Sequence, residues 1–338
     1  MSRLITDDHS LLPFKLSGAA RSAAAIYPFK TTEYYLGLVR HLNMSDPVFL
    51  QLAPDGREIE DNHSPDPFCE EEKTKAPRLI HRYPQRAVFL ANNSCASHCR
   101  HCMRKRRWTE APSVASVEEV KEAARYCQEK QIEDIIISGG DPFLLPGAYL
   151  DEIVARFREV PSLKIIRIGT RLPVVDPERV KRNMLNKLRK RGPLYLMLHY
   201  NHPQEWSPLG DELLDDMRRM GFLLMNQSVL LKGVNDSEET LYHLFMGLLQ
   251  RGVKPYYLHQ CDLVRGVTHF WVELTRSVDL LRNLQGHISG LALPYLAIDL
   301  PGGLGKVLLG PSHRLQKSGS RYKLRTFRGK DVFYGKEE

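Results

Sequence analysis

Three cysteines stand close together in the segment NNSCASHCRHCMRKRRW, at Cys95, Cys99 and Cys102. Their C-x3-C-x2-C spacing brings three metal-binding thiolates into one loop. A structural zinc site uses four protein ligands, whereas a [4Fe–4S] cluster on three cysteines leaves one iron for another molecule. The missing fourth cysteine therefore favours the cluster. His98 or His101 would complete a zinc site, so a zinc knuckle is the alternative.

A lysine follows a glycine-rich turn near the end of the chain, in the segment DLPGGLGK from Asp299 to Lys306. Its spacing, and the absence of Ser or Thr after Lys306, exclude a P-loop. A lysine placed in this way can form a Schiff base with pyridoxal phosphate, although alone the segment would be an ordinary glycine turn. Arg82 and Arg86, four residues apart, are suited to hold a phosphate or, alone, to form a surface basic patch.

The motif Ser138-Gly139-Gly140-Asp141 is a third candidate ligand-binding segment. Its glycines let the backbone approach a ligand and its acid can accept from an ammonium group, although by itself it would be a tight turn. Weaker signals are the polar residues that follow or end later β-rich runs. They are Gly169-Thr170-Arg171, His199 and Asn226-Gln227-Ser228.

From Arg86 onward, β-rich runs alternate with amphipathic segments, and this alternation must position the residues above. Strands are predicted at 87–91, 134–138, 165–169, 194–200, 223–231 and 254–259, with a seventh apolar run at 291–298. Helices are predicted at 115–129, 147–159, 177–190, 210–220, 237–251 and 271–285. The alternation predicts a parallel sheet, and the lack of a GxGxxG motif favours a barrel with its site at the carboxyl ends of the strands.

The predicted fold class is thus α/β, a partial (β/α)6 TIM-type barrel over residues 81–306. Residues 1–80 form an N-terminal helical extension, with one helix at 31–43, and residues 307–338 form a short C-terminal extension. The 42% hydrophobic content and mean hydropathy of -0.35 exclude a fibrous or disordered chain. Neither a membrane span nor a signal peptide is found, so we expect a cytoplasmic protein without a membrane partner. The net charge of +8 fits several partners and decides nothing.

Taken in chain order, these motifs resemble the lysine 2,3-aminomutases, which are radical S-adenosylmethionine (radical SAM) enzymes that also use pyridoxal phosphate. The resemblance covers most of residues 75–310. It is carried by the collinear segments HRYPQR, CASHCRHC, SGGD, IRIGTRLPVV, HYNHP, NQSVLLKGVND, PYYLHQCD and DLPGGLGK.

The resemblance implies a role for each candidate residue. The cysteines Cys95, Cys99 and Cys102 would hold a [4Fe–4S] cluster. Catalytic Lys306 would carry pyridoxal phosphate, with Arg82 and Arg86 on its phosphate. The residues implied around S-adenosyl-L-methionine are His101, Ser138, Gly139, Gly140, Asp141, His199 and Gln227.

For the substrate, the resemblance implies that Arg104 pairs with the α-carboxylate and that Asp262 and Asp299 hold the far ammonium of lysine. Two acids suit an ammonium group, whereas a glutamate-handling relative would need a basic or amide group there. The alternative role of these two acids is helix capping or loop solvation.

The implied activity is that of an isomerase, an L-lysine 2,3-aminomutase that converts L-lysine to β-lysine. Lysine would replace Lys306 on the cofactor imine, and a 5′-deoxyadenosyl radical would take hydrogen from C3. The imine nitrogen would then migrate, and hydrogen would return from 5′-deoxyadenosine, regenerating S-adenosylmethionine. The family also implies an electron donor such as flavodoxin or ferredoxin and a homo-oligomer.

Two alternatives stay open at this point. The same fold would act on another amino acid, or on tRNA or another RNA, with the basic run Arg104-Lys105-Arg106-Arg107 contacting phosphates. Otherwise the cysteines would build a zinc-dependent nucleic-acid-binding module.

Longer relatives bind zinc through a cysteine after GVND and a cysteine-rich tail, but Ser237 follows GVND here and no cysteine follows Cys261. We therefore predict no zinc, and we interpret Cys69, Cys127 and Cys261 as free buried thiols.

Overall fold

The structure is a computed structural model that describes residues 2–6, 14, 16–310, 316–318, 321–326 and 328–335 of the 338. A ten-stranded sheet lies at its centre, in the order β12-β11-β10-β9-β8-β7-β6-β5-β4-β3. The strands from β5 to β11 run parallel, and antiparallel strands are added at both edges. The predicted α/β class is confirmed.

Each predicted strand run coincides with one of the parallel strands, and the apolar run at 291–298 overlaps the seventh. These strands are β5 (Arg86–Asn92), β6 (Asp134–Gly139), β7 (Ile165–Gly169), β8 (Tyr195–Leu198), β9 (Leu223–Leu230), β10 (Lys254–Gln260) and β11 (Tyr295–Leu300). The edge strands are β3 (Thr74–Ala76), β4 (Leu79–Tyr83) and β12 (Gly305–Leu309). Strand β12 continues past Lys306, across the boundary at which we expected the C-terminal extension to begin.

The helices connect the strands and pack in neighbouring pairs, such as α5 with α6 and α10 with α11. The long ones are α5 (Val117–Glu129), α6 (Gly147–Arg158), α8 (Arg182–Leu188), α9 (Pro208–Arg219), α10 (Glu238–Gln250) and α11 (Leu274–Leu284). Short turns of helix are α7 (Leu172–Val175), η2 (Lys105–Arg107), η3 (Pro142–Leu144), η4 (Pro177–Arg179), η5 (Arg189–Arg191), η6 (Pro203–Glu205), η7 (Thr268–Phe270) and η8 (Pro301–Gly303). The helix predicted at 177–190 is interrupted, because η4 ends at Arg179 and α8 begins at Arg182.

The strands separate their side chains between two environments, as the period of two demands. On β6, Ile135 and Ile137 are fully buried in the main hydrophobic core, while Ile136 and Ser138 line the central cavity. Strand β7 repeats the pattern with Ile168 in the core and Gly169 at the cavity. One face of the sheet therefore holds the helices and the other faces the site.

The two edges of the sheet approach each other across the cavity. Arg82 on β4 donates from Nη2 to Asp299 Oδ1 on β11 at 3.0 Å, although six strands separate β4 from β11 in the sheet order. The sheet must therefore curl. Among the described residues, the outer edges of β3 and β12 have no strand partner, so the sheet does not close and the barrel is partial.

The N-terminal extension is mostly irregular. Its elements are β1 (Leu4–Thr6), α1 (Gly18–Ile26), β2 (Lys30–Thr32), α2 (Glu33–Leu36), α3 (Pro47–Leu50), η1 (Gly56–Glu58) and α4 (Glu70–Lys73). The helix predicted at 31–43 is wrong, because residues 30–32 pair with β1 and α2 ends before Gly37. Beyond it, Asp46 Oδ2 accepts hydrogen bonds from the backbone N–H groups of Arg40 and His41 and holds the chain in turns.

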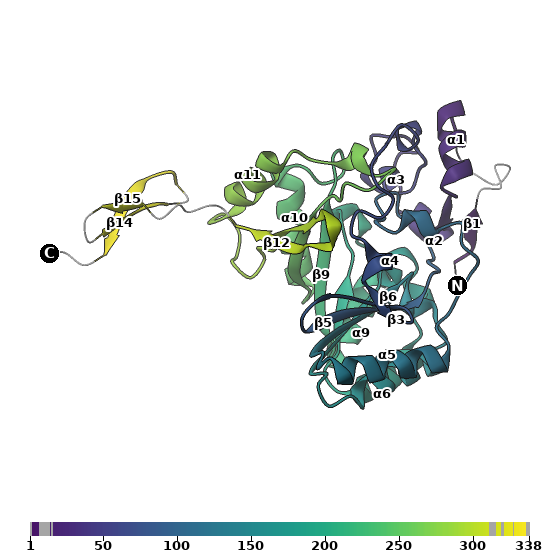
Figure 1. The fold of residues 1–338 in the computed structure, drawn as a ribbon. Helices are drawn as coiled ribbons and strands as arrows, with labels where there is room; N and C mark the ends of the chain where they lie inside the picture. The colour runs from purple at the N-terminus through teal and green to yellow at the C-terminus, as the bar shows by residue number, and fades with distance from the viewer. Residues whose placement is uncertain are drawn as a thin grey trace.

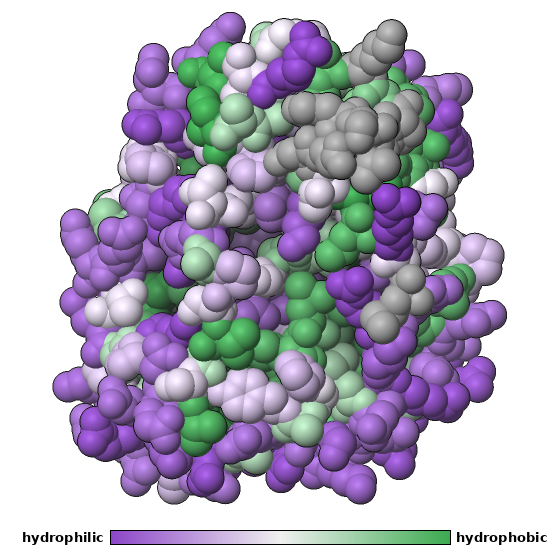
Figure 2. Space-filling view, turned by 90° about the vertical axis from the view of Figure 1, so that its right-hand side faces the viewer, coloured by the Kyte–Doolittle hydropathy of each residue, from purple (hydrophilic) through white to green (hydrophobic). Residues whose placement is uncertain are grey.

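The C-terminal residues form a separate antiparallel sheet of β13 (Gln316–Ser318), β14 (Arg321–Arg325) and β15 (Asp331–Gly335). Figure 1 shows β14 and β15 projecting from the main body, on the side opposite the N-terminus. The face that carries the N-terminal segment is mostly hydrophilic at its rim, with hydrophobic side chains gathered nearer its centre (Figure 2). In the part of the chain that the structure describes, no helix combines the length and apolar character needed to cross a membrane.

Candidate active site

A cavity of about 360 Å³ lies inside the curled sheet and extends to the carboxyl ends of its strands. Its walls include every residue that the sequence singled out for cluster, cofactor or substrate binding. These are Arg82, Arg86, Cys95, Cys99, His101, Cys102, Arg104, Ser138, Gly139, Gly140, Asp141, His199, Gln227, Asp262, Asp299 and Lys306. Residues up to 224 positions apart in sequence, from Arg82 to Lys306, therefore share one cavity.

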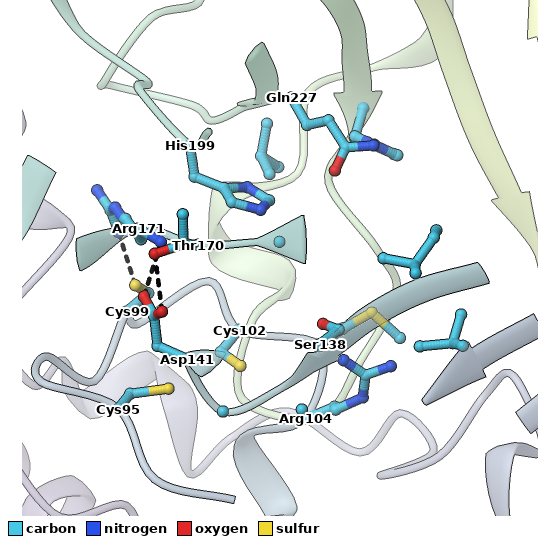
Figure 3. A pocket seen from close by; sticks show the side chains of 18 of the residues that line it. Cys95, Cys99, Cys102, Arg104, Ser138, Asp141, Thr170, Arg171, His199 and Gln227 are labelled. Atoms are coloured by element: carbon cyan, nitrogen blue, oxygen red, sulfur yellow. Dashed lines mark hydrogen bonds between the residues drawn. The ribbon is translucent and has the colours of Figure 1, made fainter. Parts of the chain in front are cut away.

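The three cysteines lie in the loop that follows β5, and all three line the cavity (Figure 3). All three thiols are free, and Arg171 donates from Nη1 to Cys99 Sγ at 2.6 Å. Burial raises the pKa of Cys102 to about 11 and that of Cys95 well above its ordinary value. Metal binding at this loop would therefore displace protons.

The donor set fits a multi-iron cluster better than one zinc ion. Among the described residues, no three His, Cys, Asp or Glu side chains converge closely enough to share a single metal ion. In a cubane cluster each thiolate binds a different iron, so its ligands lie farther apart than the ligands of one zinc. His98, a candidate fourth zinc ligand, stacks on Trp108 and has its Nδ1 2.8 Å from the Pro28 carbonyl oxygen.

A buried ion triad holds the cysteine loop in place. Arg100, between the second and third cysteines, pairs with Glu58 of η1, and Lys105 Nζ lies 2.6 Å from the same carboxylate. All three side chains are fully buried. Burial lowers the pKa of Lys105 to about 8. A residue of the N-terminal extension thus neutralises charges inside the cluster loop.

The glycines of the Ser138–Asp141 motif are required by the chain itself. A Cβ on Gly139 would lie 2.1 Å from the Asn92 carbonyl oxygen, and one on Gly140 would lie 2.1 Å from the Ser94 carbonyl oxygen. Asp141 accepts hydrogen bonds from Thr170 Oγ1 and from the backbone N–H groups of Phe143, Arg171 and Leu172 (Figure 3). The motif therefore packs β6 against the start of the cysteine loop and caps the turn after β7.

Two histidines and a glutamine face the cavity beside the cysteines. His199 follows β8 and Gln227 lies on β9. Burial lowers the pKa of His199 to about 3 and lowers that of His101 well below its ordinary value. Both imidazoles are therefore neutral near pH 7. His101 Nδ1 is buried and has no hydrogen-bond partner among the described residues, so it can accept or donate to a bound molecule.

Lys306 is positioned by a hairpin between β11 and β12. The register pairs Asp299 with Lys306 directly, so both side chains lie on one face, toward the cavity. The turn between them needs glycine, since Gly302, Gly303 and Gly305 all have positive φ angles of 66–101°. A Cβ on Gly303 would also lie 2.8 Å from the Phe68 carbonyl oxygen.

The Lys306 ammonium sits among groups of mixed charge. It donates to Asp299 and lies 3.2 Å from His259 Nδ1. Burial would raise the pKa of Asp299, but His259, Lys306 and hydrogen bonds hold it below its ordinary value. Burial lowers the pKa of Lys306 against the opposing effect of Asp299. A nitrogen with a lowered pKa is the better nucleophile for a carbonyl cofactor.

Asp262 follows β10 and differs from Asp299. Burial first, and then repulsion from Asp299, raises the pKa of Asp262 to about 7. No side-chain hydrogen bond to its carboxylate is found in the described part of the chain. The two acids therefore form a pair in which Asp299 is ionised and Asp262 accepts a cation most strongly above neutral pH.

Cations that fit a phosphate also line the cavity. Arg86 lies over the Tyr83 ring, 4.2 Å from its centroid, and Arg167 lines the cavity while pairing with Asp134. The buried Tyr83 hydroxyl has no partner in the described chain. Arg82 is already paired with Asp299, so a bound phosphate would share the Arg82 guanidinium with this carboxylate. With Lys306 also in the cavity, these residues fit pyridoxal phosphate.

Arg104 faces the cavity from the end of the cysteine loop (Figure 3). Its Nε and Nη2 donate to the carboxylate of Glu70 at 2.7–3.1 Å. The rest of the basic run is also paired inside the chain. Lys105 is buried on Glu58, Arg106 contacts Asp66 and Glu70, and Arg107 pairs with Glu110.

Several contacts of the site escaped sequence reasoning. Glu70 and His259 line the cavity and Glu58 binds the cysteine loop, but sequence reasoning assigned no role to any of them. Glu58 and Glu70 come from a segment that shows no sustained period. His259 stands within the predicted strand 254–259, where alternation would have placed it on the cavity face with Tyr257.

Comparisons with known proteins agree with this geometry. A model described as the Radical SAM superfamily matches residues 91–245, and one described as Lysine-2,3-aminomutase matches residues 281–338. The L-lysine 2,3-aminomutase of Methanococcus maripaludis is 37% identical over 313 residues, covering 91% of this chain and 72% of that protein. The L-lysine 2,3-aminomutase of Fusobacterium nucleatum is 36% identical, with 91% and 73% covered. The glutamate 2,3-aminomutase of Clostridioides difficile is 34% identical, with 88% and 71% covered.

Proposed function

Because the chain belongs to the lysine 2,3-aminomutase family of radical SAM enzymes, we propose that it converts L-lysine to β-lysine by moving the α-amino group to C3. Enzymes of this family use a [4Fe–4S] cluster and S-adenosylmethionine to generate a radical, and pyridoxal phosphate to carry the migrating amino group. The residues that would hold these groups are Cys95, Cys99 and Cys102 for the cluster and Lys306 for pyridoxal phosphate.

The observation that carries the choice of lysine is the distribution of charge in the cavity. Arg104 and the acids Asp262 and Asp299 all line the same cavity. A dibasic amino acid would place its carboxylate on Arg104 and its far ammonium between the two acids. Binding at both ends would fix the carbon chain between them, which is the positioning that radical chemistry needs.

Glutamate is the rival suggested by the relative from Clostridioides difficile. Its side-chain carboxylate would face Asp262 and Asp299, and two like charges in a partly buried site repel strongly. Protonation of Asp262 would remove only one of the two charges, because Asp299 stays ionised. The charges therefore support lysine.

The RNA-modifying alternative loses its main support. Arg104, Lys105, Arg106 and Arg107 are each paired with an acid of the chain, and Lys105 is fully buried. A paired and buried run is a poor phosphate contact, since nucleic-acid binding relies on exposed cations.

We also propose a low-potential electron donor of the flavodoxin or ferredoxin class, a cytoplasmic location and a homo-oligomer. All six cysteines are free, in keeping with a reducing compartment. Strand β12 is a sheet edge with exposed apolar side chains, Val307 at 39% and Leu308 at 46% exposure, and Leu304 just before it is 79% exposed. Exposed apolar sheet edges favour association, which sedimentation of the purified protein would measure.

The test uses anaerobic protein with a reconstituted cluster, pyridoxal phosphate, S-adenosylmethionine, dithionite and L-lysine. We expect β-lysine, separated from lysine by chromatography. Cleavage of S-adenosylmethionine without β-lysine would refute the proposed substrate.

Lys306→Ala tests the cofactor assignment. We expect the variant to lose both the protein-bound pyridoxal absorbance and β-lysine formation, because no other lysine lines the cavity in the described chain. Lys232→Ala, at an exposed lysine, is the control and should keep both. Full turnover by Lys306→Ala would refute the assignment.

A further inference from the structure

Residues 61–70 of the N-terminal extension, here called the brace, contact each part of the chain that carries a substrate-binding charge. The brace begins at Asp61, which is 8% exposed. Asp61 Oδ2 accepts hydrogen bonds from the backbone N–H groups of Gly266, Val267 and Thr268 at 3.0–3.3 Å and from Thr268 Oγ1 at 2.6 Å. These residues belong to the loop that begins with Asp262.

The middle of the brace reaches the lysine hairpin. The Gly302 N–H donates to the Pro67 carbonyl oxygen at 2.7 Å, in the turn before Lys306. Phe68 is buried in an apolar cluster with Val264, Val267 and other residues of the Asp262 loop. The brace is therefore anchored to the ammonium end of the cavity by hydrogen bonds and by packing.

The brace ends at Glu70, which binds Arg104 and also lines the cavity. Glu70 is 6% exposed, and burial would raise its pKa, but Arg104 lowers it below the ordinary value. The preceding residue, Cys69, has a φ of 52°, a left-handed conformation that residues other than glycine rarely adopt. Such strain persists only where the surrounding structure imposes it.

The pairing leaves one edge of the Arg104 guanidinium for a second carboxylate. Glu70 occupies the side formed by Nε and Nη2, and no side-chain or backbone acceptor for Nη1 is found among the described residues. A planar guanidinium has five N–H donors and can bind carboxylates on two edges at once. Arg106 also reaches Glu70, at 3.3 Å, and is itself paired with Asp66 at 3.4 Å, so Glu70 is held by two arginines.

We propose that Glu70 is a positioning residue that holds Arg104 so that its Nη1 edge meets the α-carboxylate of the substrate. The brace thereby fixes the spacing between this edge and the Asp262 loop, which selects an amino acid of lysine's length. This inference rests on the proposed function, because it takes an amino-acid carboxylate as the ligand of Arg104.

The test compares Glu70→Gln with Glu72→Gln in the full-length reconstituted enzyme. Glu72 lies on the same short helix and is exposed, so it is the matched control. Two quantities are measured in each variant: the KM for L-lysine and the inhibition constant of 1,5-diaminopentane, which resembles lysine without its carboxylate.

We expect Glu70→Gln to raise the KM for lysine about tenfold, because a charged hydrogen-bond partner of Arg104 is lost. The inhibition constant of 1,5-diaminopentane should change less than about twofold, since this ligand has no carboxylate to meet Arg104. An equal rise in both constants would show a general structural role and overturn the proposal. No change in either would also overturn it.

A second measurement separates failure of this inference from failure of the proposed function. If the unchanged enzyme forms no β-lysine, the proposed function fails and phenylglyoxal modification of Arg104, followed by mass spectrometry, decides the role of Glu70. Faster modification in Glu70→Gln than in Glu72→Gln would support the role of Glu70 in holding Arg104. Equal rates would overturn it.

Discussion

The barrel strands and the N-terminal segment 56–73 contribute to one cavity in different ways. The strand ends and their loops supply the groups expected to touch the reactants, such as the cysteines, Asp262 and Lys306. Segment 56–73 supplies acids that hold those groups in place, namely Glu58 on the cysteine loop, Asp61 on the Asp262 loop and Glu70 on Arg104. The barrel thus supplies the groups expected to react, and the N-terminal segment fixes the positions of the loops that carry them.

This difference predicts that damage to the two regions will have different signatures. Loss of Asp262 should reduce turnover and leave the fold intact, because its carboxylate has no hydrogen-bond partner to lose in the described structure. Loss of Glu58, which is fully buried between Arg100 and Lys105, should instead weaken the fold and the cysteine loop that it holds.

The largest effect is expected for Glu58→Gln. Removing this charge leaves Arg100 and Lys105 buried without their counter-ion, and breaking a buried pair costs about 3–5 kcal/mol. We expect a lower free energy of unfolding, measured by denaturant titration, and less iron bound per chain after reconstitution. Glu60→Gln, at an exposed neighbour, is the control. Equal free energies of unfolding for the two variants would show that Glu58 does not stabilise the fold.

Asp262→Asn should act on turnover. Losing one of two acids that face an ammonium costs about 2–5 kcal/mol of binding, or at least about 30-fold in kcat/KM for lysine. The free energy of unfolding should stay within about 0.5 kcal/mol of the unchanged protein. A variant with full kcat/KM would show that the lysine ammonium does not bind at Asp262.

A smaller effect is expected from pH. The pKa of Asp262 is raised to about 7, so this acid is protonated below that pH and ionised above it. Since the ionised form binds the cationic end of lysine, kcat/KM should rise as pH increases through about 7 and then level off. Asp262→Asn should lose this rise. A profile that is the same in both proteins would assign the titration to another group.

The strands and their motifs could be predicted because local signals define them. The β-rich runs located six of the seven parallel strands, the apolar run at 291–298 overlapped the seventh, and the glycines marked the turns before Asp141 and Lys306. The hairpin register that pairs Asp299 with Lys306 follows from the six residues between them, although sequence reasoning did not draw it.

The roles of Glu58, Asp61 and Glu70 could not be predicted, because their partners lie 34 to 207 residues away and no local period links them. The helix expected at 31–43 failed for a related reason. A side chain from a later turn, Asp46, holds the backbone at Arg40 and His41, and tertiary contacts of this kind override helix propensity.

The central claim is that the charges in the cavity select a dibasic amino acid. One measurement tests it directly: the reconstituted enzyme is given L-lysine and L-glutamate at equal concentration, and both β-amino acids are quantified. We predict β-lysine as the product, with β-glutamate below about 1% of it, because two acids face the side-chain terminus. β-Glutamate as the main product would contradict the placement of the substrate between Arg104 and the Asp262–Asp299 pair.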